Sequence, residues 1–119
     1  MKTIHKIIID HKSSYSVTVT EIKSFSDLTI FLNYLKTNKK LSKATHNSYA
    51  FRYLSSQEGK SDGGEKGAGN IILHYLQANN LNNIAVAISR YYGGIKLGSG
   101  RFKNIKQALV IFFQKTNKY

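Results

Sequence analysis

The sequence contains no cysteine, no proline and no tryptophan. Without cysteine, disulfides and thiolate metal sites are excluded. No apolar run approaches the roughly 18 to 20 residues that cross a bilayer. The N-terminal segment MKTIHKIIIDH holds only three consecutive isoleucines, which is too short for the apolar region of a signal peptide. We therefore expect a cytoplasmic protein with no membrane contact.

Acidic residues are also scarce. The 119 residues carry 18 lysines and arginines against six aspartates and glutamates, giving a formal net charge of +12. All six acids lie within residues 1–65, so residues 66–119 hold eight cations and no acid. An AT-rich genome explains the excess of lysine over arginine, but not the missing acids. The asymmetry predicts a basic face for an anionic partner, of which nucleic acid is the commonest, with compositional drift as the alternative.

The residue pattern predicts one α+β domain over residues 1–119, long enough for a hydrophobic core. Alternating or β-branched segments predict strands over residues 3–10, 14–22, 45–54 and 84–92. Apolar residues at helical spacing predict helices over residues 25–38, 70–79 and 102–115, and Ser24 with Asp27 forms a capping-box pair before the first. Residues 57–69 are predicted to be a glycine-rich loop. The order β-β-α-β-α-β-α predicts a two-layer sandwich, with helices on one face of a mixed four-stranded sheet.

Two glycine-rich loops precede predicted helices, Gly67-Ala68-Gly69 and Gly98-Ser99-Gly100. A helix N-terminus presents unpaired amides and a partial positive charge, so each loop is a candidate anion site. Lys96 and Arg101 bring further charge to the second loop. The same glycines also suit tight turns between a strand and a helix, and the two roles can coexist. The second loop matches neither the P-loop nor the dinucleotide-binding pattern.

Several motifs carry a resemblance to a known family. The segment RYYGGIKLGSG at residues 90–100 resembles the signature of the IMPACT/YigZ family. KATHNSYAFR at 43–52 and SDGGE followed by GAG at 61–69 are similar to two further family motifs, and KSSY at 12–15 is similar to a fourth. These motifs occur in the family order and span most of residues 12–110.

The resemblance implies the fold of the second domain of the fifth small-subunit ribosomal protein, with its left-handed βαβ crossover. Bacterial members usually add a ferredoxin-like C-terminal domain, and we expect this chain to lack it. Eukaryotic members regulate translation by competing for the activator of a kinase that phosphorylates an initiation factor. Bacterial members have been linked by fold to nucleic-acid or ribosome binding. The sequence departs from the family pattern at Lys66, Asn104 and Lys106, where the family has proline, arginine and tyrosine.

The leading hypothesis is a translation-associated protein that binds RNA or the ribosome through phosphate contacts. It requires no catalysis, cofactor or metal. The expected contacts are the following cations and loop residues: Arg90, Lys96, Arg101, Lys103, Lys106, Gly67, Gly69, Gly98, Ser99 and Gly100.

Two alternatives remain open. The first is a regulatory module that binds an acidic protein partner. The second is an enzyme for a small phosphate substrate that uses His46, Asp62 and Glu65, the only plausible acid–base set in the sequence. The aromatic stripe on residues 45–54 is predicted to be core, with base stacking as its alternative role.

Overall fold

The fold is built on one five-stranded sheet. The computed structural model describes residues 1–119. The strand order is β1-β2-β5-β3-β4, and every hydrogen-bonded pair is antiparallel, so the predicted mixed four-stranded sheet is wrong. The α+β class and the four predicted strands are confirmed. The strands are β1 (Lys2–Asp10), β2 (Ser13–Glu21), β3 (His46–Tyr53), β4 (Gln57–Ser61) and β5 (Ile84–Tyr91).

The strand that the sequence did not predict is β4, with the sequence QEGKS. It has no alternation of apolar and polar residues and no β-branched residue, so periodicity cannot reveal it. It forms as the sheet edge by pairing with β3, where Phe51 lies opposite Gly59. The Phe51 ring covers this glycine so closely that a Cβ atom at Gly59 would lie 2.6 Å from the ring Cζ. Short, charged strands are typical of sheet edges.

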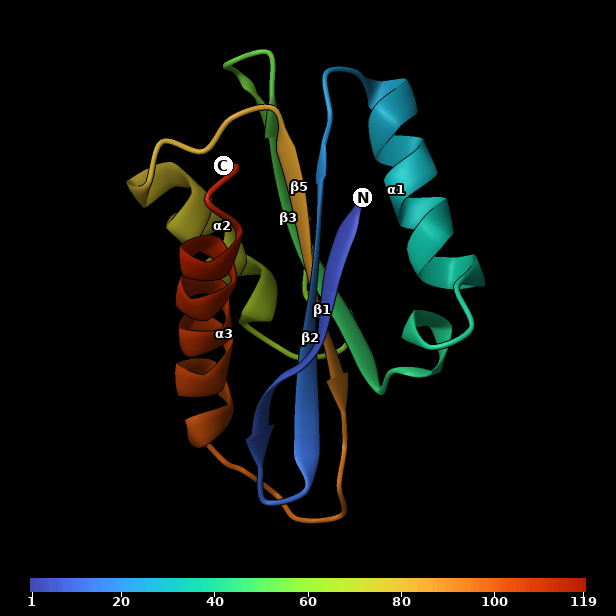
Figure 1. Cartoon of the computed structure of the whole chain (residues 1–119), viewed down its shortest axis with the longest axis vertical. Coiled ribbons are helices and arrows are strands. Elements are labelled where there is room, and N and C mark those ends of the chain that lie inside the picture. The colour runs from blue at the N-terminus through green and yellow to red at the C-terminus, as the bar shows by residue number, and fades with distance from the viewer.

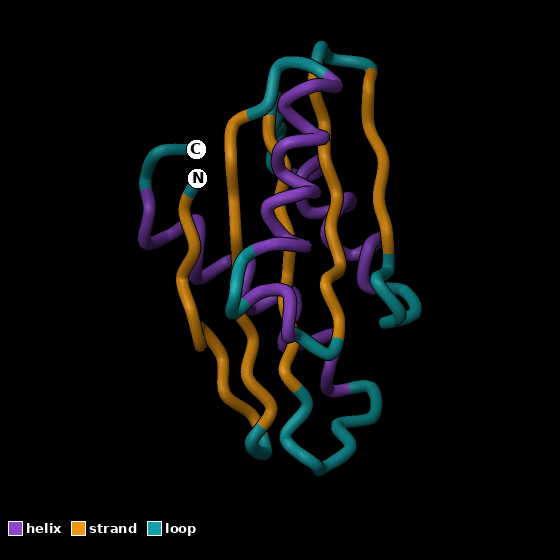
Figure 2. The backbone as a smooth tube through the Cα atoms, turned by 90° about the vertical axis from the view of Figure 1, so that its right-hand side faces the viewer, coloured by secondary structure: helices purple, strands orange, loops and turns teal.

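Helices cover both faces of the sheet, which corrects the prediction that they cover one. They are α1 (Phe25–Thr37), α2 (Ala68–Ala78) and α3 (Gly100–Thr116), with a short 3-10 helix η1 (Leu41–Lys43) after α1. Figure 1 shows α2 and α3 on one side of the sheet and α1 on the other, and Figure 2 shows α1 crossing in front of the strands. The molecule therefore has three layers. The reason lies in β5, which is buried on both faces from Ile84 to Arg90 and needs a cover on each.

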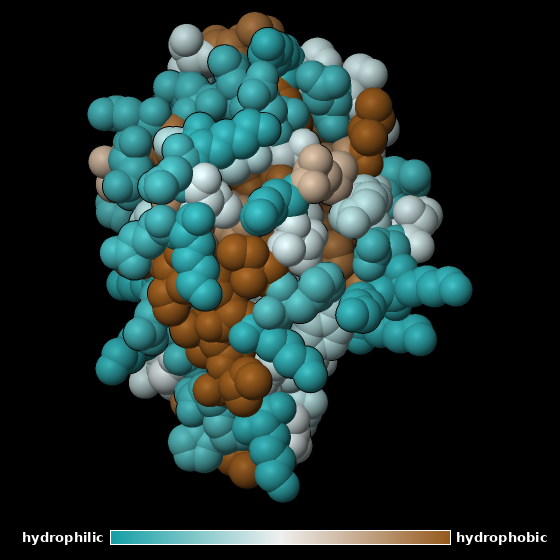
Figure 3. Space-filling model, in the orientation of Figure 1, coloured by the Kyte–Doolittle hydropathy of each residue, from teal (hydrophilic) through white to brown (hydrophobic).

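Each face of the sheet has its own apolar core. The α2 and α3 side holds fourteen buried residues, including Tyr15, Ile88 and Phe112. The α1 side holds eight, including Phe31 and Tyr53, so the aromatic stripe of β3 packs in the core as predicted. Figure 3 shows a strip of apolar side chains along α3 and β1 with hydrophilic side chains around it. None of the helices has both the length and the apolar character that a membrane span requires.

Local hydrogen bonds explain where α1 begins. Ser24 caps α1, since its Oγ accepts from the Asp27 amide at 3.1 Å, and the Asp27 carboxylate accepts from the Lys23 amide at 2.8 Å. The predicted cap is confirmed.

Strands β4 and β5 run parallel on either side of β3, and α2 connects them. The left-handed crossover implied by the family applies to this connection and stays a prediction.

Candidate anion-binding site

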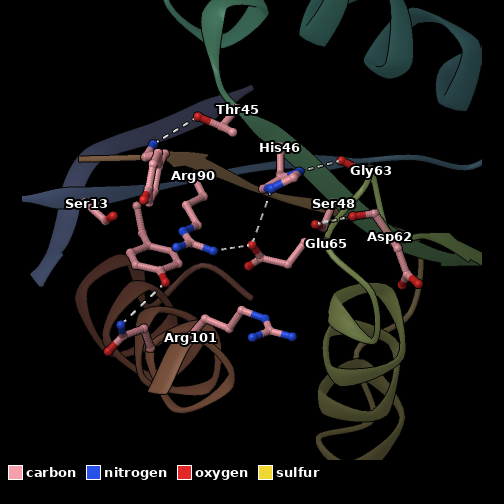
Figure 4. A network of polar contacts seen from close by, with 12 residues as sticks. Ser13, Thr45, His46, Ser48, Asp62, Gly63, Glu65, Arg90 and Arg101 are labelled. Carbon is pink, nitrogen blue, oxygen red and sulfur yellow. Dashed lines mark hydrogen bonds and ion pairs between the residues drawn. The ribbon is translucent and has the colours of Figure 1, made fainter. Parts of the chain in front are cut away.

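The candidate site forms where β5 ends. The sheet register places Arg90 of β5 opposite Tyr15 of β2 on one side and opposite His46 of β3 on the other. Arg90 Nη1 donates to Glu65 Oε2 at 2.6 Å, in the loop before α2. The exposed fractions of these two side chains are 10% and 3%, so the ion pair is buried. Figure 4 shows Glu65 between Arg90 and His46, with Arg101 reaching toward them from α3.

This pair lies at the wall of an open cavity of about 570 Å³, which we call the basic cleft. Its charged lining consists of the cations Lys66, Arg90, Lys96 and Arg101 and the carboxylate of Glu65. Four cations and one acid leave a local excess of three positive charges when His46 is neutral. The cations come from three chain segments: the loop before α2, the end of β5 with the loop after it, and the first turn of α3. The predicted residues Arg90, Lys96 and Arg101 are thus brought together.

Arg101 is held in position in the first turn of α3. Its Nη1 donates to the Gly98 carbonyl oxygen at 2.7 Å, and its guanidinium carbon lies 4.4 Å from the centre of the Phe102 ring. Both contacts restrict the long side chain, which reduces the entropy that would be lost on binding an anion. The guanidinium is therefore already oriented at the edge of the basic cleft, where it can donate hydrogen bonds to an anion.

The first glycine loop already has an anion of its own. The Asp62 carboxylate accepts from the Gly67 amide at 3.1 Å and from the Gly69 amide at 2.8 Å. These two hydrogen bonds hold the pKa of Asp62 below its ordinary value. The amides of Gly67 and Gly69 are therefore already hydrogen-bonded to a carboxylate of the protein, and we do not place an external anion there.

The second glycine loop keeps free donors. The Gly100 amide donates to the Leu97 carbonyl at 3.1 Å, but the amides of Gly98 and Ser99 donate no hydrogen bond within the protein. Both residues are exposed, and Gly98 lines the basic cleft. This loop remains the better of the two candidate anion seats.

The hypothetical acid–base set is only partly assembled. His46 Nδ1 donates to the Gly63 carbonyl at 3.1 Å, and its Nε2 lies 3.8 Å from Glu65 Oε2. Asp62 is not part of this cluster, because its carboxylate turns toward the start of α2 (Figure 4). Glu65 is committed to Arg90. The geometry brings His46 and Glu65 together but gives them no second acid.

Helix geometry separates Lys103 and Lys106 from the basic cleft. Successive helical residues are about 100° apart, so these two lysines point away from Arg101 on the same helix. Lys103 is exposed, and Lys106 lines a different groove of about 680 Å³ beside α2. The five predicted cations thus divide into a cleft set and an outer pair.

The sequence alone did not identify Lys66 and Tyr92 as part of the site. They line the basic cleft because the loop before α2 packs against the end of β5. Asn104 is not among the residues that line the cleft; its Nδ2 donates to Asp10 Oδ2 at 2.9 Å and to the Tyr15 hydroxyl at 3.4 Å. The Asn104 hydrogen bond is the main cause that lowers the pKa of Asp10. Asn104 therefore holds Tyr15, which lies opposite Arg90 in the sheet, and does not itself line the cleft.

Two solved structures have a similar fold, and one of them is a translational regulator. A crystal structure of a hypothetical protein matches with a TM-score of 0.76 and 26% identity, over 91% of this chain and 56% of that chain. The two-domain translational regulator Yih1 matches with a TM-score of 0.60 and 26% identity, over 91% of this chain and 44% of that chain.

Related sequences identify the family. The IMPACT homolog of Caenorhabditis elegans is 36% identical over 107 residues, which cover 84% of this chain and 42% of that protein. The IMPACT protein of Mus musculus is 37% identical over 103 residues, covering 82% and 32%. The chain thus spans less than half the length of these relatives. Residues 11–111 match the model of the Impact N-terminal domain. The resemblance seen in the motifs is confirmed, and the chain belongs to the Impact N-terminal domain family.

Proposed function

We propose that this domain acts in translation by binding RNA, free or on the ribosome, through phosphate contacts in the basic cleft. The observation that carries the proposal is the convergence of Lys66, Arg90, Lys96 and Arg101 on one open cavity that contains a single acid. Phosphate is the anion that such a cluster of lysine and arginine donors suits best. The role in translation is suggested by the likeness to the translational regulator Yih1.

The contacts differ in kind. Arg90 and Arg101 offer planar guanidinium groups that can hold phosphate oxygens through two hydrogen bonds, whereas Lys66 and Lys96 act as point charges. The free amides of Gly98 and Ser99 add neutral donors at the rim. None of these groups reads a base edge, so we expect little sequence preference and a strong dependence on salt.

Co-sedimentation with ribosomes and total RNA tests this function, at salt concentrations from about 50 to 200 mM. The variant Lys96→Glu/Arg101→Glu reverses two cleft charges, and Lys103→Glu/Lys106→Glu reverses the outer pair as a control with the same change in net charge. We expect the cleft variant to lose attachment and the control to retain most of it. Equal loss in both variants would contradict a role for the cleft, and no attachment of the wild type at about 50 mM salt would contradict RNA binding itself.

A regulatory protein-interaction module is the second candidate, and the likeness to Yih1 favours it. An acidic protein would meet the same cations of the basic cleft. Nuclease treatment before capture separates the two functions, because a protein partner is retained when RNA is destroyed. Loss of all binding after nuclease treatment would rule against this candidate.

A further inference from the structure

We propose that the basic cleft holds the terminal phosphate of an RNA strand, a phosphomonoester, with the adjoining base on Tyr92. This inference rests on the proposed function, because it names the part of the RNA that the cleft takes. On this inference the cleft binds the end of an RNA strand and not a phosphate in the middle of the strand.

The first argument is an unsatisfied donor on a residue that lines the cleft. Arg90 Nη1 is occupied by Glu65, but its Nε is buried and has no hydrogen-bond partner. Buried donors in folded proteins are almost always paired, so an unpaired donor on a cleft residue points to a missing acceptor. A phosphate oxygen is suitable, because one guanidinium can serve a carboxylate and a phosphate along different edges.

The second argument is that the guanidinium of Arg90 is mostly covered, which favours an anion with oxygens free on its leading side. The Arg90 side chain is 90% covered. An internal phosphodiester carries a ribose on both sides of its phosphorus and has only two free oxygens. A phosphomonoester has one ester bond and three free oxygens. It also carries a charge of about −1.5 to −2 at neutral pH against −1 for a diester, which better matches the local excess of positive charge.

The third argument concerns the base next to that phosphate. Tyr92 is 47% exposed, lines the cleft, and its ring centre lies 6.0 Å from the guanidinium carbon of Arg90. The ring lies near Arg90 with part of its surface exposed, so it is placed to stack on the base next to a bound phosphate. The cavity of about 570 Å³ falls within the size of small-ligand sites, about 300 to 1,000 Å³, and suits a single nucleotide.

Fluorescence anisotropy with RNA oligomers of one sequence tests the inference. The oligomers carry hydroxyls at both ends, a 5′-phosphate or a 3′-phosphate, with the dye placed internally. We expect a terminal phosphate to tighten binding about tenfold or more at fixed salt, since it adds charge-assisted hydrogen bonds. Lys96→Gln/Arg101→Gln should abolish this preference, whereas the matched outer variant Lys103→Gln/Lys106→Gln should keep it.

The possible outcomes separate this inference from the proposed function. Equal affinity for all the oligomers would overturn end binding and leave RNA binding intact, whereas absence of binding to any of them would overturn both. Competition distinguishes the base from the phosphate: adenosine monophosphate should displace the oligomer at a lower concentration than inorganic phosphate does, and Tyr92→Ala should remove that difference. Equal displacement of the oligomer from the wild type would overturn the contact with Tyr92.

Discussion

The buried ion pair between Glu65 and Arg90 makes the stability of this domain depend on one carboxylate. We consider the change Glu65→Ala. Glu65 is 3% exposed and its Oε2 lies 2.6 Å from Arg90 Nη1, so removing it leaves a covered guanidinium without its counter-charge. Breaking one partner of a buried ion pair costs about 3–5 kcal/mol, a large part of the roughly 5–15 kcal/mol that a domain has.

Urea unfolding measures this loss as a free energy, and thermal unfolding measures it as a melting temperature, both followed by circular dichroism. At about 4 °C per kcal/mol for a domain of this size, the melting temperature should fall by roughly 12–20 °C. Glu58→Ala is the matched control, because Glu58 lies on the edge strand β4 and its exposed carboxylate accepts one hydrogen bond, from Gln77 Nε2 at 2.7 Å. We expect that control to change the free energy of unfolding by about 0.5 kcal/mol or less.

A double substitution identifies the cause of the loss. In Arg90→Met/Glu65→Leu both charges are absent, so no orphaned charge remains, and most of the lost stability should return. A loss of about 1 kcal/mol or less in Glu65→Ala would refute the reasoning. A double variant as unstable as the single one would show that packing, and not the unpaired charge, is responsible.

Four further substitutions, one of them a control, test the surrounding architecture. Amide hydrogen bonds lower the folded pKa of Asp62, so its contribution to stability is present above its unfolded pKa and is lost as pH falls through the folded pKa. Urea unfolding at pH 7 and at about pH 3 measures the free energy of unfolding that is lost in acid. This loss should be smaller in Asp62→Asn than in the wild type. A Cβ at Gly93 would overlap the Lys12 backbone, so Gly93→Ala should lose about 3 kcal/mol in the same assay, whereas a Cβ at Gly100 meets nothing within 4 Å and Gly100→Ala should lose none. Ser55 has a φ of 62° in the turn before β4, so Ser55→Gly should gain about 0.5–1 kcal/mol, and a loss there would contradict the strain.

Local patterns were enough to predict most of the fold. The alternation of Tyr15, Val17 and Val19 predicted β2, and Ser24 with Asp27 predicted the start of α1, because these features act within a few residues. Strand β4 was not predictable in this way, since QEGKS forms a strand only through its ladder with β3. The position of α1 on the second face of the sheet was also not predicted. The continuous apolar run of β5 nevertheless indicates a strand that is buried on both faces.

The candidate site was predictable only where its residues are neighbours in sequence. Arg90, Lys96 and Arg101 lie in one glycine-rich stretch, and the structure places all of them at the basic cleft. Lys66 joins them through the packing of the loop before α2, which no local pattern encodes. The Gly67 and Gly69 amides looked equally available in the sequence, but the fold brings the carboxylate of Asp62 onto them.

The salt dependence of RNA affinity tests the central claim most directly. For a single strand, the slope of log affinity against log salt changes by about 0.7 for each phosphate contact. We predict that Lys96→Gln/Arg101→Gln reduces the magnitude of the slope by about 1.4, and that Lys103→Gln/Lys106→Gln leaves it nearly unchanged. An unchanged slope in the cleft variant, or the same reduction in both variants, would contradict phosphate binding in the basic cleft.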